Sequence, residues 1–406
     1  MSASAAPAPP PAPGPPIPYA RHHVDDGDRA AVLRALASPA IAQGPEAEAL
    51  GAELARTIGT RHGVAVTSGT AALTAALGAL GVGPGDEVIV PPLTFVATAN
   101  AVLACGARPR FADVEPDTLN LDPAAVARAV TSRTRGAIPV HYAGHPADVA
   151  AIAEALGPGR FVLEDACHAL GAAVGERAAG ALGHAACFSF HPAKAITTGE
   201  GGAVVTDDAE LAGAVRRLRD HGLERAHSGR RGLGLPPEWD AEQRGDWVYE
   251  LHALGTNHRL AEPAAALGRS QLARLASRVA RRRALAERYT SALAGEDALV
   301  LPSERPGVRS AWHLYPVRVQ PGTLRGGRAA LFAALRMRGI GVQVHYVPVH
   351  LQPLYRERLG TRFGDHPVAE QAYLGLLSLP LHPWLGDADW DRVLDELRGE
   401  LRRARR

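Results

Sequence analysis

Lysine is nearly missing from this sequence. The chain carries 44 lysine and arginine residues, and Lys194 is its only lysine. A guanidinium group stays protonated at every physiological pH, whereas an amine can lose its proton and attack a carbonyl carbon. The single retained lysine therefore predicts chemistry that arginine cannot perform, and formation of a Schiff base is the first candidate. Its surroundings between residues 188 and 202, rich in serine, threonine and glycine, argue against a chance survivor on the surface.

Cysteines and long apolar runs are also scarce. Cys105, Cys167 and Cys187 form neither a Cys-x-x-Cys motif nor an even set, which predicts buried thiols in a reducing compartment. No apolar run reaches the ~20 residues that span a bilayer, and the first residues lack the pattern of a secretory signal. A formal charge of +2 gives no basis for nucleic-acid binding. We therefore expect a cytoplasmic protein with no membrane or nucleic-acid partner, and no metal site is predicted.

The 406 residues suggest two domains behind a short tail. Residues 1–18 are rich in proline and alanine and are expected to be disordered. Short apolar runs then alternate with helical patterns, for example at 71–80 and 123–130. The predicted strands are 64–67, 87–90, 109–112, 136–140, 161–164, 186–190 and 202–206. This alternation predicts an α/β domain with a mostly parallel sheet, whose ligands bind beyond the carboxyl ends of the strands.

The second half of the chain has a different pattern. Residues 224–256 are charged, with glycines, two tryptophans and little periodicity, which indicates a long excursion such as a lid or a subunit-contact loop. A predicted helix over residues 262–293 follows. The remaining predicted elements are strands 314–319 and 342–347 and helices 328–338 and 390–403. We expect a large domain over residues 19–260 and a smaller α+β domain over residues 261–406.

A turn between a predicted strand and a predicted helix offers a site for an anion. Ser68, Gly69 and Thr70 follow the strand at 64–67 and open an alanine-rich helix. Free amide N–H groups and the positive end of the helix dipole favour a phosphate at such a position. A plain helix cap made by Ser68 or Thr70 is the favoured explanation of this segment taken alone.

An acid stands at the carboxyl end of another predicted strand. Asp165 follows the apolar residues 161–163, where a carboxylate needs a positive or hydrogen-bonding partner. A protonated pyridine nitrogen is one such partner, and a helix cap is the alternative. His168 lies three residues further on, close enough to reach the same ligand. Together with Gly69 and Lys194, these residues supply an anion site, a pyridinium partner and an amine, which predicts binding of pyridoxal 5'-phosphate (PLP).

Ordered motifs along the chain resemble the DegT/StrS family of sugar aminotransferases. The family has the PLP-dependent transferase fold type I of aspartate aminotransferase, and the resemblance extends from about Tyr19 to the C-terminus. The matching segments are residues 68–73, 85–89, 94–100, 164–166, 188–192 with Lys194, 198–202, 257–260 and 265–272. Thr67 departs from the family, which usually has asparagine there, and the excursion at 224–256 is long for the group.

The resemblance implies a role for each matching cofactor residue. Lys194 would bind PLP as a Schiff base and shuttle a proton, Asp165 would pair with the pyridinium, and His168 would hydrogen-bond the phenolic oxygen. The other implied cofactor contacts are Phe95 on the ring and Gly69, Thr70 and Ser189 on the phosphate.

Contacts to the substrate and to a second subunit are implied as well. The implied sugar contacts are Tyr19, Gln43, Arg259, His313, Tyr315 and His345, with ordinary loop or core positions as the alternative. Asn257 would reach the phosphate in the neighbouring subunit, which implies a homodimer with shared active sites.

Within the family the chain is most similar to the UDP-4-amino-4,6-dideoxy-N-acetyl-β-L-altrosamine transaminases of pseudaminic acid biosynthesis, on residues 168–171, 189–192, 313–316 and 343–346. That similarity implies transfer of the amino group of L-glutamate to C4 of a UDP-linked 4-keto-6-deoxy-N-acetyl hexosamine. Another nucleotide-linked keto sugar, or a ketocyclitol, stays open as the acceptor. A sugar 3-dehydratase of this family has histidine at the position of Lys194 and is disfavoured, and a non-catalytic regulatory protein would have a degraded cofactor site.

Overall fold

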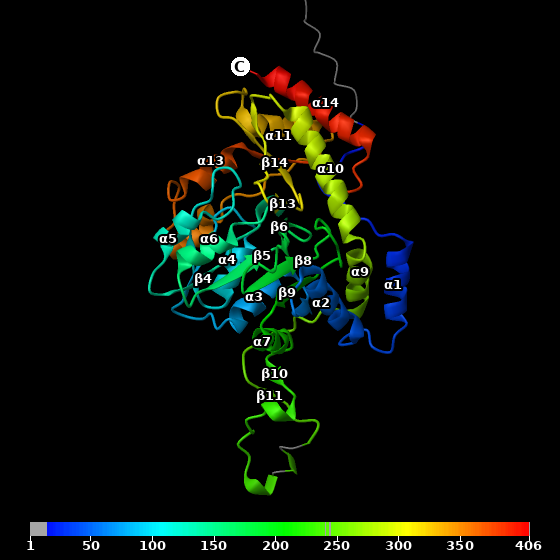
Figure 1. Ribbon diagram of the computed structural model, residues 1–406, viewed down its shortest axis with the longest axis vertical. Helices are drawn as coiled ribbons and strands as arrows, with labels where there is room; N and C mark the ends of the chain where they lie inside the picture. Colours follow the sequence, from blue (N-terminus) through cyan, green and yellow to red (C-terminus); the bar gives the residue numbers. More distant parts are fainter. Residues whose placement is uncertain (1–13, 240, 243–244, 406) are drawn as a thin grey trace, which may run out of the picture.

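The computed structural model describes residues 14–239, 241–242 and 245–405 (Figure 1). Its helices are α1 (Asp26–Leu36), α2 (Pro45–Ile58), α3 (Gly69–Ala79), α4 (Ala97–Ala104), α5 (Pro123–Ala129), α6 (Val149–Leu156), α7 (Ala209–Arg219), α9 (Glu262–Leu272), α10 (Leu275–Leu293), α11 (Gly327–Met337), α12 (Pro353–Leu359), α13 (Pro367–Gly375) and α14 (Asp387–Ala404), with short 3₁₀ turns at Tyr142–Gly144, His227–Gly229, Pro237–Trp239 and Val349–Leu351. None of the helices in the described ranges is long and apolar enough to cross a membrane.

The strands fall into one large sheet and several small ones. They are β1 (His62–Val66), β2 (Glu87–Val90), β3 (Arg108–Phe111), β4 (Thr134–Ala137), β5 (Phe161–Asp165), β6 (Ala173–Val174), β7 (Arg177–Ala178), β8 (Ala185–Ser189), β9 (Gly202–Thr206), β10 (Leu223–Glu224), β11 (Glu250–Leu251), β12 (Leu299–Val300), β13 (Val308–Arg309), β14 (Tyr315–Val319) and β15 (Leu376–Leu379).

A seven-stranded sheet, in the order β1-β9-β8-β5-β4-β2-β3, forms the centre of the molecule. β9 runs antiparallel to both of its neighbours, and every other pair in this sheet is parallel. Each of the seven strands overlaps a predicted one, and β2 and β9 match their predictions at both ends. The mostly parallel α/β sheet predicted from the alternating pattern is confirmed.

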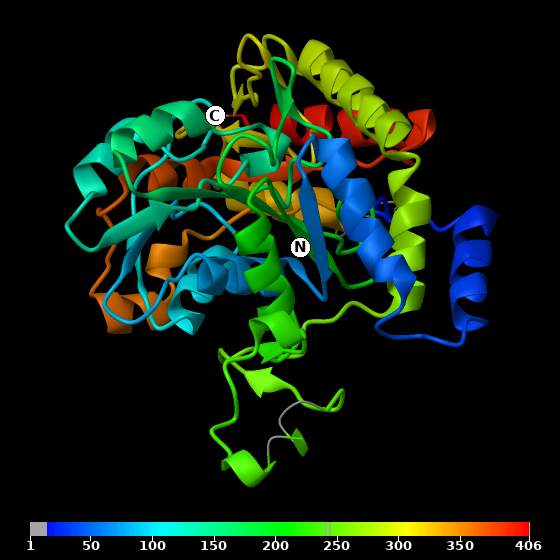
Figure 2. The same ribbon diagram turned by 60° about the horizontal axis from the view of Figure 1, so that its bottom comes forward.

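Side chains alternate across this sheet, so each strand contributes to two layers of core. Val64 and Val66 of β1 pack with residues of α3, α4 and α7 on one face. Ala65, between them, packs with residues of α2 and α9 on the other. That second face is continued by α5 and α6, which pack over β2, β4 and β5. Because helices cover both faces (Figure 2), the strands read as continuous apolar runs in the sequence.

Parallel strands bring their carboxyl ends to one edge of a sheet. Ser68 follows the end of β1, β5 ends at Asp165, and β8 ends at Ser189. β5 and β8 are neighbours, with Asp165 opposite Cys187. The loop that carries Lys194 joins β8 to β9 at this same edge. The topology therefore gathers residues from separate stretches of chain into one region.

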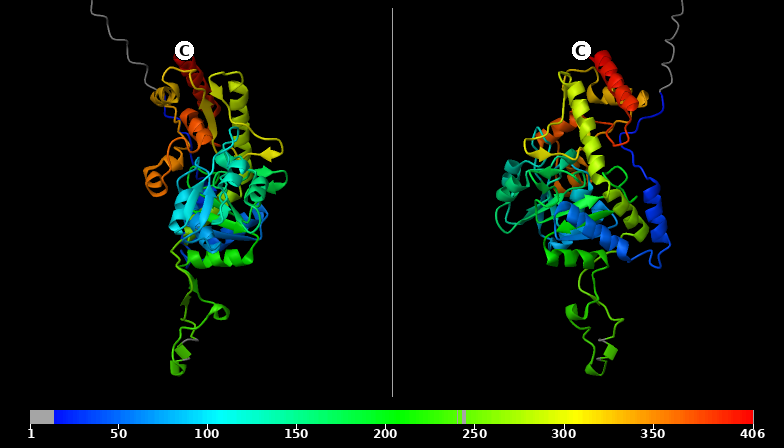
Figure 3. Two further views of the ribbon diagram at one scale, coloured as in Figure 1. Left: turned by 90° about the vertical axis from the view of Figure 1, so that its left-hand side faces the viewer. Right: turned by 45° about the vertical axis from the view of Figure 1, so that its right-hand side comes forward.

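The C-terminal part of the chain has a core of its own. β12, β14 and β15 form a three-stranded sheet, which packs with α11, α14 and the second half of α10. The long helix α10 connects the region of the central sheet to this layer (Figures 1 and 3). Leu275 and Val279 of α10 belong to the core of the central sheet, whereas Leu285 belongs to the second core. We therefore propose that the domain boundary falls inside α10, whereas the sequence prediction placed it after residue 260.

Two predicted elements differ from the structure. The helix predicted over residues 262–293 is two helices, because Arg274 leaves the helical conformation with φ −110° and ψ 10° and pairs with Asp25 and Asp28 of the α1 region. The strand predicted at 342–347 is reduced to a single bridge between Gln343 and Ser378. Both differences arise from contacts with distant segments, which local periodicity does not report.

Ile17 departs from the expected disordered tail. Its side chain is 2% exposed, it forms a parallel bridge with Ile340, and its N–H donates to the carbonyl oxygen of Gly339 at 2.9 Å. Residues 1–13 of the predicted tail lie outside the described residues. The N-terminal segment is thus anchored to the C-terminal layer from Ile17 onward.

The excursion predicted at 224–256 is an arm that projects from the body beyond α7 (Figures 1 and 3). β10 and β11 pair at its base. Trp239, Trp247 and Leu254 are 55%, 69% and 94% exposed. The arm therefore presents large apolar side chains to its surroundings.

Candidate active site

Lys194 lies at the carboxyl edge of the central sheet, in the loop between β8 and β9. Its backbone N–H donates to the carbonyl oxygen of His191 at 2.8 Å, and its side chain is half-buried. Burial lowers the pKa of the Lys194 amine below its usual range, an effect that nearby Cys167 and Asp165 oppose and Arg282 reinforces. A larger share of the amine is therefore unprotonated at neutral pH than on a solvent-exposed lysine.

The carboxylate of Asp165 is held at the end of β5 by two donors. The residue is 5% exposed. The Thr98 hydroxyl donates to Oδ2 at 2.8 Å, and the backbone N–H of Cys167 donates to Oδ1 at 3.3 Å. The Thr94 hydroxyl lies 2.7 Å from that of Thr98, so it can donate to Thr98 while Thr98 donates to the carboxylate. Asp165 thus presents a fixed negative charge at the edge of the sheet.

Thr98 is one of the residues of this site to which sequence reasoning assigned no role. It lies within the segment 94–100 that resembles the sugar aminotransferases, but its spacing from Asp165 in the sequence carries no signal of contact. Only the fully buried position of Thr98 at the start of α4, facing the end of β5, brings the two side chains together.

A buried acid next to Asp165 organises the same strand end. Glu164 is fully buried and accepts the backbone N–H groups of Gly180, Leu182 and Gly183 at 2.7–2.8 Å. Its Oε2 also accepts Nε2–H of His141 at 2.8 Å, because His141 Nδ1 accepts a backbone N–H and leaves the proton on Nε2. The backbone N–H of His141 in turn donates to the carbonyl oxygen of Asp165.

Replacing Glu164 by glutamine is expected to destabilise the fold by about 3–5 kcal/mol, the usual effect of breaking a buried, fully bonded charge network. Each carboxylate oxygen accepts two donors, so the amide of glutamine would point its own N–H groups at N–H groups in either orientation. The urea midpoint of unfolding measures the loss. The exposed Glu154, replaced in the same way, is the matched control and should leave the midpoint unchanged. Equal midpoints for the two variants would contradict this account.

The turn before α3 forms a small cradle. Ser68 caps the helix, because its hydroxyl accepts the backbone N–H of Ala71 at 3.0 Å. A Cβ added to Gly69 would lie 2.9 Å from Cβ of Ser189, so glycine is needed for this close approach. The cap and the anion cradle, which the sequence left as alternatives, are therefore compatible. Ser68 satisfies one amide, while the amides of Gly69 and Thr70 open the helix beside the Ser189 hydroxyl.

Three histidines lie close enough to Lys194 to feel its charge. The rings of His168 and His313 lie 4.4 Å apart, and His345 is held by a hydrogen bond between its Nδ1 and the Ser378 hydroxyl at 2.9 Å. Burial, followed by the positive charge of Lys194, lowers the pKa of all three rings, and that of His345 falls to about 4. These imidazoles are therefore neutral at physiological pH. Among the described residues no three histidine, cysteine or acidic side chains converge as metal ligands do.

Aromatic rings complete this region. Phe95 is 56% exposed, and its ring lies 6.1 Å from that of Tyr346. The Tyr346 hydroxyl lies 3.0 Å from Nε2 of His168. The ring of Tyr19 lies 5.5 Å from that of His345. The predicted contacts Tyr19, Phe95 and His345 are therefore linked, through Tyr346, to the histidines beside Lys194.

The remaining predicted contacts lie elsewhere in this chain. Tyr315 is fully buried in the second core, where its hydroxyl hydrogen-bonds with Thr290 at 2.8 Å. Gln43 and Arg259 line a separate small hollow, in which Arg259 pairs with Asp220. Asn257 is exposed. The structure does not bring these four residues to Lys194, and their roles stay predictions.

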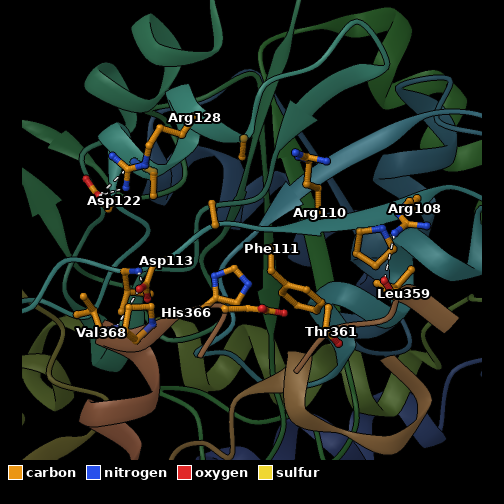
Figure 4. Close-up of a pocket in the computed structure, with 17 residues that line it drawn as sticks. Arg108, Arg110, Phe111, Asp113, Asp122, Arg128, Leu359, Thr361, His366 and Val368 are labelled. Atoms are coloured by element: carbon orange, nitrogen blue, oxygen red, sulfur yellow. Dashed lines mark hydrogen bonds and ion pairs between the residues drawn. The ribbon is translucent and has the colours of Figure 1, made fainter. Parts of the chain in front are cut away.

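A second hollow, of about 640 Å³, lies along the edge strand β3 (Figure 4). Its polar groups are largely occupied: Arg128 pairs with Asp122 at 3.7 Å, and Asp113 accepts the N–H groups of Val368 and Ala369 at 3.0 Å. None of the predicted site residues lines this hollow. This hollow is therefore separate from the candidate site, which lies at the sheet edge around Lys194.

Comparison with known proteins identifies relatives of this chain. The sequence profile of the DegT/DnrJ/EryC1/StrS aminotransferase family matches residues 23–398. The spore coat polysaccharide biosynthesis protein SpsC of Bacillus subtilis (strain 168) is 40% identical over 385 residues, which cover 94% of this chain and 96% of SpsC.

Solved structures have the same architecture. PseC of Helicobacter pylori, an aminotransferase involved in the biosynthesis of pseudaminic acid, is 28% identical with a TM-score of 0.86, and the match covers 96% of this chain and 100% of PseC. Spr1654 of Streptococcus pneumoniae, solved in its PLP form, is 28% identical with a TM-score of 0.86 over 96% of this chain and 99% of that one. The predicted fold type I, with its aspartate aminotransferase-like architecture, is confirmed.

Proposed function

This chain belongs to the DegT/DnrJ/EryC1/StrS aminotransferase family, and we propose that it transfers the amino group of L-glutamate to C4 of a UDP-linked 4-keto-6-deoxy-N-acetyl hexosamine with PLP bound at Lys194. One observation carries the proposal. The only lysine of the chain lies half-buried at the carboxyl edge of the sheet, with a lowered pKa and a buried carboxylate, Asp165, beside it.

The residues present fit PLP. His168 is 6% exposed, and its Nδ1 is buried without a hydrogen-bond partner in the described chain, as expected for a group that a ligand satisfies. The approach of Gly69 to Ser189 leaves backbone N–H groups and a hydroxyl open to a phosphate. Asp165 supplies the negative charge that keeps a pyridine nitrogen protonated.

The cofactor supplies an electron sink for the carbon from which a proton is removed. The chain supplies the rest. Lys194 would hold the cofactor through Nζ and would carry a proton to and from the reacting carbon, a task that its lowered pKa suits. Asp165 would stabilise positive charge on the ring nitrogen, Phe95 would cover the ring, and the neutral His168 would donate a hydrogen bond to the phenolic oxygen. Lys194 would act as the acid and the base, because its amine can both take up and release a proton.

The keto sugar and its nucleotide are proposed from the resemblance to the pseudaminic-acid enzymes and from the similarity to PseC and SpsC. His313 and His345 feel the charge of Lys194, and the ring of Tyr19 lies against His345. Their neutral hydrogen-bonding groups would suit sugar hydroxyls and an N-acetyl group. The purified protein should therefore aminate a UDP-4-keto-6-deoxy-N-acetyl hexosamine with glutamate. Mass spectrometry of reactions with UDP- and dTDP-linked keto sugars and a ketocyclitol measures this. If the enzyme prefers a dTDP-linked sugar or a cyclitol, the proposed acceptor is wrong.

The enzyme acts as a homodimer that shares its active sites. The carbonyl oxygen of His258 accepts the N–H of Thr67 at 3.0 Å, which ties the residue after Asn257 to the end of β1. Asn257 itself is exposed, and the neighbouring arm presents Trp247 and Leu254, whose apolar area favours a protein partner. Light scattering should give the mass of a dimer. A fully active monomer would contradict the shared site.

Capture of PLP by the ligand-free protein is expected to accelerate as pH rises and to level off at a pH below the usual lysine pKa. The free amine is the reactive form, and burial lowers the pKa of Lys194, so the reactive fraction rises earlier than on an exposed lysine. Stopped-flow absorbance measures the rate across pH, with Nα-acetyl-lysine methylamide as the reference amine. A midpoint equal to that of the reference would contradict the shifted pKa.

A further inference from the structure

We propose that Tyr346 is a positioning residue that fixes His168 in the tautomer with its proton on Nδ1. The inference deepens the proposed function, because an Nδ1–H aimed into the site is what an anionic oxygen on the cofactor ring would require. Tyr346 ends the segment 343–346 that carries the resemblance, but the sequence assigns it no role. It comes from the segment after Gln343 that was predicted as a strand and is not one.

The contact between the two side chains is direct. The Tyr346 hydroxyl lies 3.0 Å from Nε2 of His168. The other ring nitrogen of His168, Nδ1, is buried without a hydrogen-bond partner among the described residues. A neutral imidazole carries one proton, on one nitrogen or the other, and the partner of the first nitrogen decides which form is favoured.

Both groups hold the protons that this arrangement needs. Burial and the charge of Lys194 lower the pKa of His168, so the ring is neutral and carries a single proton. Burial raises the pKa of the Tyr346 hydroxyl, which therefore stays protonated and can donate. When Tyr346 donates to Nε2, the ring proton must lie on Nδ1. If the proton were on Nε2 instead, Nδ1 would carry a buried lone pair. That lone pair would repel an anionic oxygen.

The ring of Tyr346 is itself held in place. It lies 6.1 Å from the ring of Phe95 and 4.9 Å from that of His345, in an edge-on arrangement. His345 in turn bonds to Ser378, and its carbonyl oxygen accepts the Tyr142 hydroxyl. A phenylalanine at position 346 would keep these ring contacts and remove only the donor. Y346F therefore isolates the hydrogen bond.

The tautomer can be read directly on the ligand-free protein. In protein labelled with ¹⁵N-histidine, the His168 signals are identified by their loss in H168Q. Wild type should show a protonated Nδ1 and an unprotonated Nε2, and Y346F should shift the proton toward Nε2. Y289F, which removes a buried hydroxyl bonded to the carbonyl oxygen of Pro380 far from His168, is the matched control. A protonated Nε2 in wild type, or no change in Y346F, overturns the proposal.

A double-mutant cycle on PLP affinity gives the second readout. Y346F should weaken PLP binding about fivefold, the equivalent of one net hydrogen bond of about 1 kcal/mol. In the H168Q background the same change should have no effect, because a glutamine amide has no tautomer to fix. Equal losses in both backgrounds overturn the proposal. If no variant binds PLP, the proposed function fails, while the nitrogen signals still decide the tautomer.

Discussion

Replacing Lys194 by arginine is expected to abolish transamination, lowering kcat by about four orders of magnitude or more, since proton transfer alone contributes about 10²–10⁴. Arginine keeps the positive charge and most of the length but cannot give up its proton or bond to a carbonyl carbon. Steady-state assays with glutamate and a keto sugar measure the loss.

Two controls separate chemistry from charge. Adding a small primary amine such as ethylamine to K194A should restore part of the rate, because it replaces the lost proton carrier. Introducing R29K into the K194R protein should restore nothing, since Arg29 is exposed on α1, away from the site. A K194R enzyme that retains more than a few per cent of the wild-type rate would contradict the assigned role.

Replacing Asp165 by asparagine is expected to lower kcat by about 10²–10³, the loss seen when one preorganised electrostatic partner is removed. The shape of the side chain is kept, but its single oxygen can accept only one of the two hydrogen bonds that Thr98 and Cys167 now donate to different carboxylate oxygens. The charge that favours a protonated ring nitrogen is lost. Single-turnover kinetics with glutamate measures the half-reaction without the sugar.

Thr98 provides the matched control for this prediction. T98S keeps the hydroxyl that donates to Asp165 and should stay close to wild type, whereas T98V keeps the volume and loses the donor. T98V should therefore slow the half-reaction by less than D165N, because the carboxylate keeps its charge and loses only one of its two donors. A D165N enzyme as fast as T98S would contradict the electrostatic role.

Much of the site could be predicted from residue types and strand order. Asp165 stands at the end of an apolar run and Lys194 in the loop that follows another, and in a mostly parallel sheet such ends meet at one edge. Ser189 was implied only by the resemblance to the sugar aminotransferases. The scarcity of lysine added an independent signal, because a single retained amine among arginines points to a chemical requirement. These arguments need only local sequence and topology.

The supporting residues could not be predicted, because their contacts join distant segments. Thr98 reaches Asp165 across 67 positions, and Tyr346 reaches His168 across 178. In the sequence Glu164 is only one residue of a predicted strand. The four hydrogen-bond donors that hold its carboxylate at the sheet edge are evident only in the structure. The break between α9 and α10 also depends on distant contacts, because Arg274 at the break forms ion pairs with Asp25 and Asp28.

The most direct measurement is borohydride reduction of the protein after incubation with PLP, followed by proteolysis and mass spectrometry. The account predicts that the peptide containing Lys194 gains the mass of one phosphopyridoxyl group on Nζ, and that prior reduction blocks turnover with glutamate. An unmodified Lys194 peptide in fully active protein would contradict it.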